Sequence, residues 1–101
     1  MTRLVVTADA ERDASEIILF LVREAGPAVA ADYVSRFRFT LERLVELPET
    51  GAPRPSLGPN VRIGIVSPYI LIYDFVRGDD DLVLLRILHG RRNITRDMLR
   101  G

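Results

Sequence analysis

The dipeptide Gly26-Pro27 separates two stretches that each carry the apolar spacing of an amphipathic helix. The stripe before it consists of Ala10, Ala14, Ile17 and Leu21. The stripe after it consists of Ala30, Val34, Phe37, Leu41 and Leu44. Glycine favours the position that follows a helix and proline the first turn of the next one, so we expect one helix to end here and another to begin. Because the link is so short, the two helices should be antiparallel neighbours.

Strand patterns flank this helical hairpin. A short strand is predicted at Arg3–Thr7, with Thr7 or Asp9 as the cap of the first helix. After the helices, the segment from Pro48 to Pro59 contains four prolines and two glycines, which favours an ordered surface connection. Three strands should follow at Val61–Val66, Tyr69–Val76 and Asp81–His89. The predicted fold is therefore α+β: an N-terminal strand, a helical hairpin, a three-stranded antiparallel sheet and a short helical C-terminal tail, in one domain over residues 1–101.

Tight turns at Ser67-Pro68 and at 77–80 predict the register of the sheet, with residue 62 opposite 73 and residue 73 opposite 84. The face predicted to pack on the helices holds Val61, Ile63, Ile65, Ile70, Ile72, Val83, Leu85 and Ile87. The face predicted to lie outside holds Arg62, Gly64, Leu71, Tyr73, Phe75, Leu82, Leu84 and Arg86. An outer face with so many apolar side chains favours a binding surface for a partner. The alternative is that the tail, residues 93–99, covers it.

Composition excludes several classes of function. The chain has no cysteine, so disulfides, thiolate zinc sites and cysteine nucleophiles are ruled out. No apolar run approaches the ~18 residues of a membrane span, and we expect a cytoplasmic protein without a cofactor or metal. All fourteen basic residues are arginine, and from Leu82 onward there are five arginines and one aspartate. This basic end favours an anionic or carboxylate-rich partner.

The order and spacing of several motifs resemble the RelE/ParE superfamily of toxins from bacterial type II toxin–antitoxin systems. The resemblance is carried by Ala10, Asp13 and Ile17, by the stretch from Ala30 to Gly58, by Arg62, by Tyr69–Tyr73 and by Leu84–Asn93. It implies growth arrest, roles in plasmid or stress maintenance, and neutralisation by an antitoxin that wraps the toxin. RelE-like members cut mRNA on the ribosome, whereas ParE-like members inhibit DNA gyrase.

The ending from Leu88 to Asn93 favours the ParE-like branch, a non-enzymatic gyrase inhibitor that meets DNA only through its antitoxin. The candidate partner-binding residues are Arg62, Leu71, Tyr73, Phe75, Leu84, Arg86, Arg91 and Arg92. The alternative is a ribosome-dependent endoribonuclease, in which Arg62 and Arg86 would stabilise phosphate and His89 would transfer a proton. Strand alternation instead favours a structural His89. A third alternative is a non-toxic, degenerate member that survives as a binding module.

Overall fold

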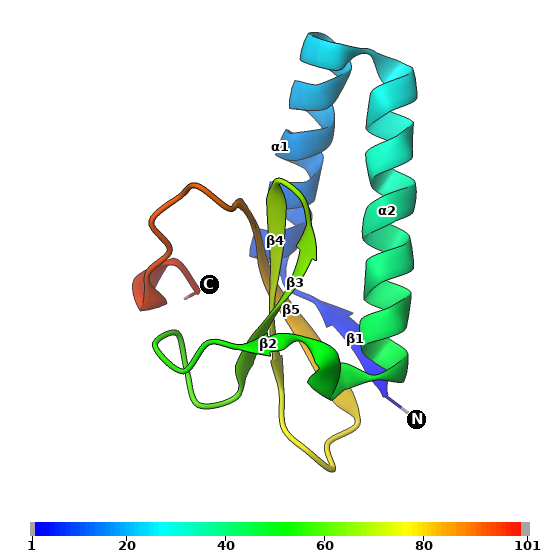
Figure 1. Cartoon of the computed structure of the whole chain (residues 1–101). Helices are drawn as coiled ribbons and strands as arrows, with labels where there is room; N and C mark the ends of the chain where they lie inside the picture. Colours follow the sequence, from blue (N-terminus) through cyan, green and yellow to red (C-terminus); the bar gives the residue numbers. More distant parts are fainter. Residues whose placement is uncertain (1, 100–101) are drawn as a thin grey trace.

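The structure is a computed structural model that describes residues 2–99. In chain order its elements are β1 (Arg3–Val6), α1 (Ala8–Ala25), α2 (Pro27–Glu46), the 3-10 turn η1 (Pro48–Thr50), β2 (Ala52–Pro53), β3 (Val61–Val66), β4 (Tyr69–Phe75), β5 (Asp81–His89) and the 3-10 turn η2 (Arg96–Leu99). The hairpin of α1 and α2 stands on one side of the sheet, and the C-terminal tail lies on the other (Figure 1).

The ends of both helices follow the sequence signals. The Thr7 side chain caps α1 by accepting a hydrogen bond from the Ala10 amide at 3.1 Å, while Asp9 and Glu11 lie in the positively polarised first turn. Gly26, at φ +92°, ends α1 in a conformation that glycine adopts without strain, and Pro27 begins α2. The predicted helical hairpin is confirmed.

The sheet has five strands in the order β1-β5-β4-β3-β2. β1 pairs in parallel with β5, and the other pairs are antiparallel. The predicted strands are present, with β1 and β4 each ending one residue early, at Val6 and Phe75. The two-residue strand β2 was not predicted, because it forms within the proline-rich connection and pairs only with Arg62 and Ile63.

The predicted pairs are correct: Arg62 lies opposite Tyr73, and Tyr73 opposite Leu84. A β-bulge follows, because Ile72 pairs with Arg86 and leaves Leu85 without a counterpart. From this point the alternation of β5 is shifted by one residue. Arg86 therefore shares a face with Ile72 and not, as predicted, with Tyr73.

The predicted assignment of the two faces is wrong. The face that packs on α1 and α2 is the one expected to lie outside, and its cluster contains Val66, Tyr69, Leu71, Tyr73, Leu82, Leu84 and Ile87, joined by Ala10, Phe37 and Leu44 from the helices. Both faces are apolar, so hydrophobicity did not distinguish them. The distinguishing residue is Gly64, where an added Cβ would lie 2.9 Å from the Leu44 side chain. Only a glycine admits α2 this close to the sheet.

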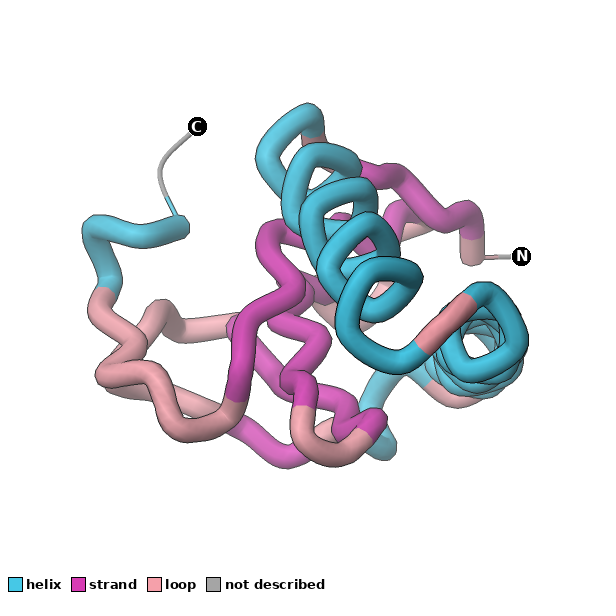
Figure 2. Tube along the Cα trace, turned by 90° about the horizontal axis from the view of Figure 1, so that it is seen from above, coloured by secondary structure: helices cyan, strands magenta, loops and turns pink. Residues whose placement is uncertain are grey.

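The opposite face is covered by the chain itself. Its buried cluster consists of Leu57, Val61, Ile63, Ile72 and Leu88, with Ile94, Met98 and Leu99 packed against it. Figure 2 shows the C-terminal tail on the side of the sheet away from the helices. The tail thus acts as the cover that we considered as an alternative, but on the other face.

Candidate functional site

Tyr73 and Arg62 hold the turn that follows α2. The Tyr73 hydroxyl donates a hydrogen bond to the Pro48 carbonyl at 2.6 Å and accepts one from the Gly51 amide at 3.1 Å. The Arg62 guanidinium donates to the carbonyls of Glu49 and Gly51 at 2.8 and 2.7 Å. Burial raises the pKa of the Tyr73 phenol, which therefore remains a hydrogen-bond donor at neutral pH. The polar groups of both side chains are therefore engaged in hydrogen bonds with the chain's own backbone.

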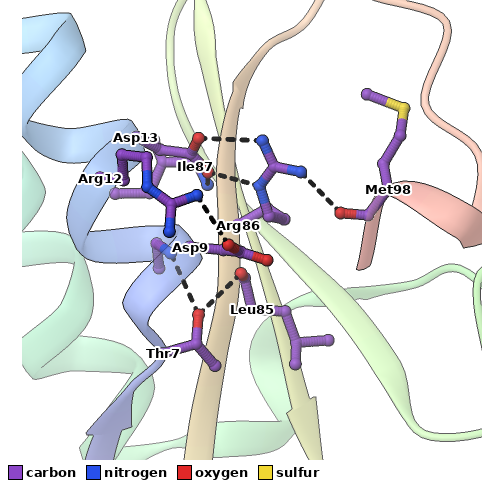
Figure 3. Close-up of polar contacts among 9 residues, drawn as sticks. Thr7, Asp9, Arg12, Asp13, Leu85, Arg86, Ile87 and Met98 are labelled. Carbon is purple, nitrogen blue, oxygen red and sulfur yellow. Dashed lines mark hydrogen bonds and ion pairs between the residues drawn. The ribbon is translucent and has the colours of Figure 1, made fainter. Parts of the chain in front are cut away.

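Arg86 lies at the other end of the sheet and forms an ion pair with Asp13 of α1 (Figure 3). Its guanidinium donates to both carboxylate oxygens, at 2.7 and 2.9 Å, and to the Met98 carbonyl at 2.6 Å. The Ile87 amide also donates to Asp13. These hydrogen bonds to the carboxylate raise the pKa of Arg86 above its ordinary value. One arginine therefore ties α1, β5 and the C-terminal tail together.

The candidate ribonuclease residues do not assemble into one site. Arg62 lies on the helix-facing side of β3, whereas the bulge places Arg86 on the opposite face. His89 is exposed at the end of β5, where its Nδ1 accepts a hydrogen bond from the Arg91 amide at 3.1 Å. Its ring lies edge-on to Tyr69. The three side chains share no common pocket in the described part of the chain.

The other candidate residues divide into buried and exposed groups. Leu71 and Tyr73 are fully buried, so neither offers a surface to a partner in this fold. Leu84 is 2% exposed and Phe75 is half-buried against the same cluster, so each offers little surface. Arg91 and Arg92 are exposed in the loop after β5. Arg92 borders a shallow depression beside Phe20 and His89. Within residues 2–99, these are the two arginines of the predicted set that are exposed and form no ion pair, whereas Arg62 donates to backbone carbonyls and Arg86 pairs with Asp13.

One cavity was missed by the sequence analysis. It is a groove of about 660 Å³ between α1, α2 and the strands β1 and β5, and we call it the helix–strand groove. Its lining residues are mostly apolar and comprise Leu4, Val6, Ala10, Ala14, Ile18, Val34, Phe37, Leu41, Val45, Leu84 and Ile87, with Glu11, Ser15, Arg38 and Glu42 as the polar ones. The sequence does contain one indication of this groove. Ile18 widens the apolar stripe of α1 beyond what the sheet can cover.

The edge of the sheet adjoins this groove. β1 is the last strand on its side, paired only with β5 within residues 2–99. Val6 on this strand is 38% exposed. The arrangement suits an amphipathic segment that inserts an apolar face between the helices, or an extended segment that adds to β1. Within the same residues, no three His, Cys, Asp or Glu side chains are arranged to hold a metal ion, and no helix is long and apolar enough to cross a membrane.

Comparison with known proteins gives concordant results. A family model described as the ParE toxin of a type II toxin–antitoxin system, parDE, matches residues 4–94. Toxin ParE3 of Caulobacter vibrioides is 30% identical over 94 residues, which cover 93% of this chain and 92% of that protein.

Two solved structures share the fold. A chain of the chromosomal ParDE TA system from P. aeruginosa superposes with a TM-score of 0.74 at 26% identity, covering 88% of this chain and 96% of that one. A chain of the toxin–antitoxin complex RelBE2 from Mycobacterium tuberculosis gives a TM-score of 0.60 at 23% identity, covering 87% and 96%. The predicted fold class is confirmed by these structures.

Proposed function

Because the chain belongs to the ParE toxin family of type II toxin–antitoxin systems, we propose that it arrests growth by inhibiting DNA gyrase through protein–protein contact and is neutralised by a cognate antitoxin. Both encounters would take place in the cytoplasm. The antitoxin would be the product of a neighbouring reading frame, and the toxin would meet DNA only through it.

The helix–strand groove is the observation that carries the antitoxin proposal. The groove is open to solvent and is lined by eleven apolar residues and four polar ones. It therefore exposes apolar surface that a partner can remove from water. The polar residues Glu11, Arg38 and Glu42 can hydrogen-bond or pair with the polar side of an inserted helix. An amphipathic antitoxin segment fits this combination, because its apolar stripe would fill the space between α1 and α2. The two structural neighbours belong to a ParDE TA system and to the RelBE2 toxin–antitoxin complex.

The arrangement of polar side chains supports contact inhibition rather than RNA cleavage. A ribonuclease needs groups that activate the 2′-hydroxyl, stabilise the phosphorane and protonate the leaving oxygen, all within reach of one phosphate. Arg62 is engaged by two backbone carbonyls and Arg86 by Asp13, on opposite faces of the sheet. Arg91 and Arg92 remain available, and we propose that they contact acidic groups of the target.

Growth experiments with this chain separate the candidate functions. The chain is induced alone, or together with its antitoxin, and incorporation of labelled thymidine and labelled methionine is followed over the first minutes. Gyrase inhibition predicts that thymidine incorporation falls first, with filamentous cells and an induced DNA-damage response, and that the antitoxin restores both. A fall in methionine incorporation within minutes, with intact DNA, would contradict the proposal and favour the ribonuclease. Unaltered growth would favour the degenerate binding module.

A further inference from the structure

The outer edge of β3 is only half covered by β2. β2 pairs with Arg62 and Ile63 and ends there, so in the described part of the chain Gly64–Val66 have no strand on that side. The Val61 carbonyl accepts from the Arg54 amide on this edge at 2.9 Å. Alternate residues of a strand direct their backbone groups to the same edge, so the N–H and C=O of Ile65 also point outward. They are available to an added strand.

This edge carries an exposed apolar side chain on each face. Ile65 is 65% exposed and projects to the side where Ile63 is buried, away from the helices. Phe39 of α2 is 63% exposed and flanks the edge on the helix side. Proteins usually protect a free edge with charged residues, proline or a covering loop. An incoming strand would bury Ile65 and Phe39 through its alternate side chains.

Two arginines lie beside Phe39, and one of them, Arg36, is 3.9 Å from the exposed Asp32 carboxylate. Two adjoining grooves, of about 460 and 450 Å³, lie between α2 and β3 and share Phe39, Thr40 and Ile65. Arg36 lines the first and Arg43 the second, and no Asp or Glu within residues 2–99 lines either of them. The Arg43 guanidinium lies 5.9 Å from the centroid of the Phe39 ring. Complementarity therefore favours an acidic partner. A second copy of this chain is disfavoured, because edge-to-edge pairing would bring four guanidiniums together.

We propose that the β3 edge at Gly64–Val66, which we call the second docking edge, takes an extended acidic segment of a partner protein as an additional strand. The segment would form backbone hydrogen bonds with Ile65, place apolar residues against Phe39 and Ile65, and place carboxylates near Arg36 and Arg43. This inference goes beyond the toxin function. The second docking edge and the helix–strand groove lie at opposite edges of the sheet, so both can be occupied at once.

The probe for this proposal is a fluorescent peptide with a central Val-Thr-Val-Thr-Val run between two Glu-Glu pairs, compared with the same peptide flanked by Lys-Lys pairs. Fluorescence anisotropy with the full chain measures binding. The acidic peptide should bind roughly tenfold more tightly than the basic one, because only its charges complement the arginines. Hydrogen exchange of the complex should show new protection at the Ile65 amide.

Variants locate the binding. Phe39→Ser should weaken binding of the acidic peptide by about fivefold. The matched control Leu19→Ser removes a similarly exposed apolar side chain from α1 and should leave the affinity for this peptide unchanged. Arg36→Ser with Arg43→Ser should abolish the preference for acidic flanks. Equal affinity of the two peptides, no binding, or binding that Phe39→Ser leaves intact would each overturn the proposal. None of these outcomes depends on gyrase, so failure here is distinguishable from failure of the proposed function.

Discussion

At the scale of single residues, the Tyr73 phenol connects the centre of the sheet to the turn after α2. Its ring is fully buried, and its hydroxyl serves both the Pro48 carbonyl and the Gly51 amide. Gly51 is required beside it, because a Cβ at this position would collide with the Tyr73 hydroxyl. The residue that we expected in a partner-binding face is therefore a structural centre of the domain.

Replacement of Tyr73 by phenylalanine should lower the free energy of unfolding by about 1–3 kcal/mol, because it leaves two backbone groups without their partner. Urea denaturation measures the loss. Tyr33→Phe is the matched control, since its hydroxyl makes a 3.4 Å contact with the Ser67 carbonyl at an exposed site and should cost little. Equal losses in the two variants would contradict the role assigned to Tyr73.

The pH dependence of the same variant follows from the raised pKa of Tyr73. The folded state retains the phenolic proton above the ordinary pKa of 10.0, where the unfolded state loses it. The contribution of this group to stability is therefore complete below pH 10 and declines as the pH rises towards the folded pKa. Wild-type stability should fall more steeply than that of Tyr73→Phe above pH 10. Parallel curves would contradict this expectation; a residual slope is expected from Tyr69, whose pKa burial also raises.

The ion pair of Asp13 and Arg86 leads to a second prediction at this scale. Asp13→Ala should destabilise the fold by about 3 kcal/mol, because it leaves the guanidinium of Arg86 largely buried without its carboxylate. Asp32→Ala is the control, since the Asp32–Arg36 pair is 3.9 Å apart and exposed and should change stability by less than about 1 kcal/mol. Thermal or urea unfolding of both variants provides the comparison, and a similar effect of the two would refute the assignment.

At the scale of elements, the sequence predicted the helices, the strands and most of their register. Those features depend on local signals such as Gly26-Pro27 and the alternation within β3 and β4. The side of the sheet on which the helices pack was not predictable from apolar content, because the chain covers both faces. The β-bulge at Leu85 has no local sequence signal that we could use, and it alone separates Arg86 from Arg62.

The candidate site shows the same division. Exposed arginines near the end of the chain were found from charge clustering, and two of them, Arg91 and Arg92, are indeed exposed. The helix–strand groove was missed, because it arises from the separation of two helices in space and not from any one segment. Its lining comes from four elements, so no single periodicity contains it.

A pair of neighbouring residues on α1 tests the groove as the antitoxin site. Ile18 lines the groove, whereas Leu19 is 65% exposed outside it. Ile18→Glu should weaken antitoxin binding by at least about tenfold, because a carboxylate would be buried among apolar side chains. Leu19→Glu should have little effect. Titration calorimetry with the purified antitoxin measures both, and circular dichroism verifies folding. Unchanged affinity in a folded Ile18→Glu variant would place the antitoxin elsewhere.

At the scale of the whole molecule, the domain is a sheet covered on one face by a helical hairpin and on the other by the tail and the segment around Leu57 (Figures 1 and 2). The two faces of the sheet are therefore closed to a partner, which leaves the groove, the sheet edges, the outer helix surfaces and the loops. The basic loop after β5 lies at the end of the sheet and away from the groove lining. An antitoxin and a target can therefore use different parts of the surface.

This separation predicts selective loss of function. Arg91→Ser with Arg92→Ser should reduce inhibition of the target by about tenfold or more while antitoxin binding is retained, because both guanidiniums are exposed outside the groove. Arg23→Ser, an exposed substitution on α1, is the matched control. Dose–response curves for growth arrest, with pull-down by the antitoxin, measure both effects. Full toxicity of the double variant would remove the basic loop from the target interface.

The most direct test of the proposed function is a supercoiling assay with purified DNA gyrase, relaxed plasmid and this chain. We predict that the chain blocks supercoiling and causes cleaved plasmid to accumulate, and that prior addition of its antitoxin prevents both effects. If supercoiling instead proceeds normally at saturating concentrations of the chain, while the same preparation cleaves mRNA on translating ribosomes, the proposal of gyrase inhibition is wrong.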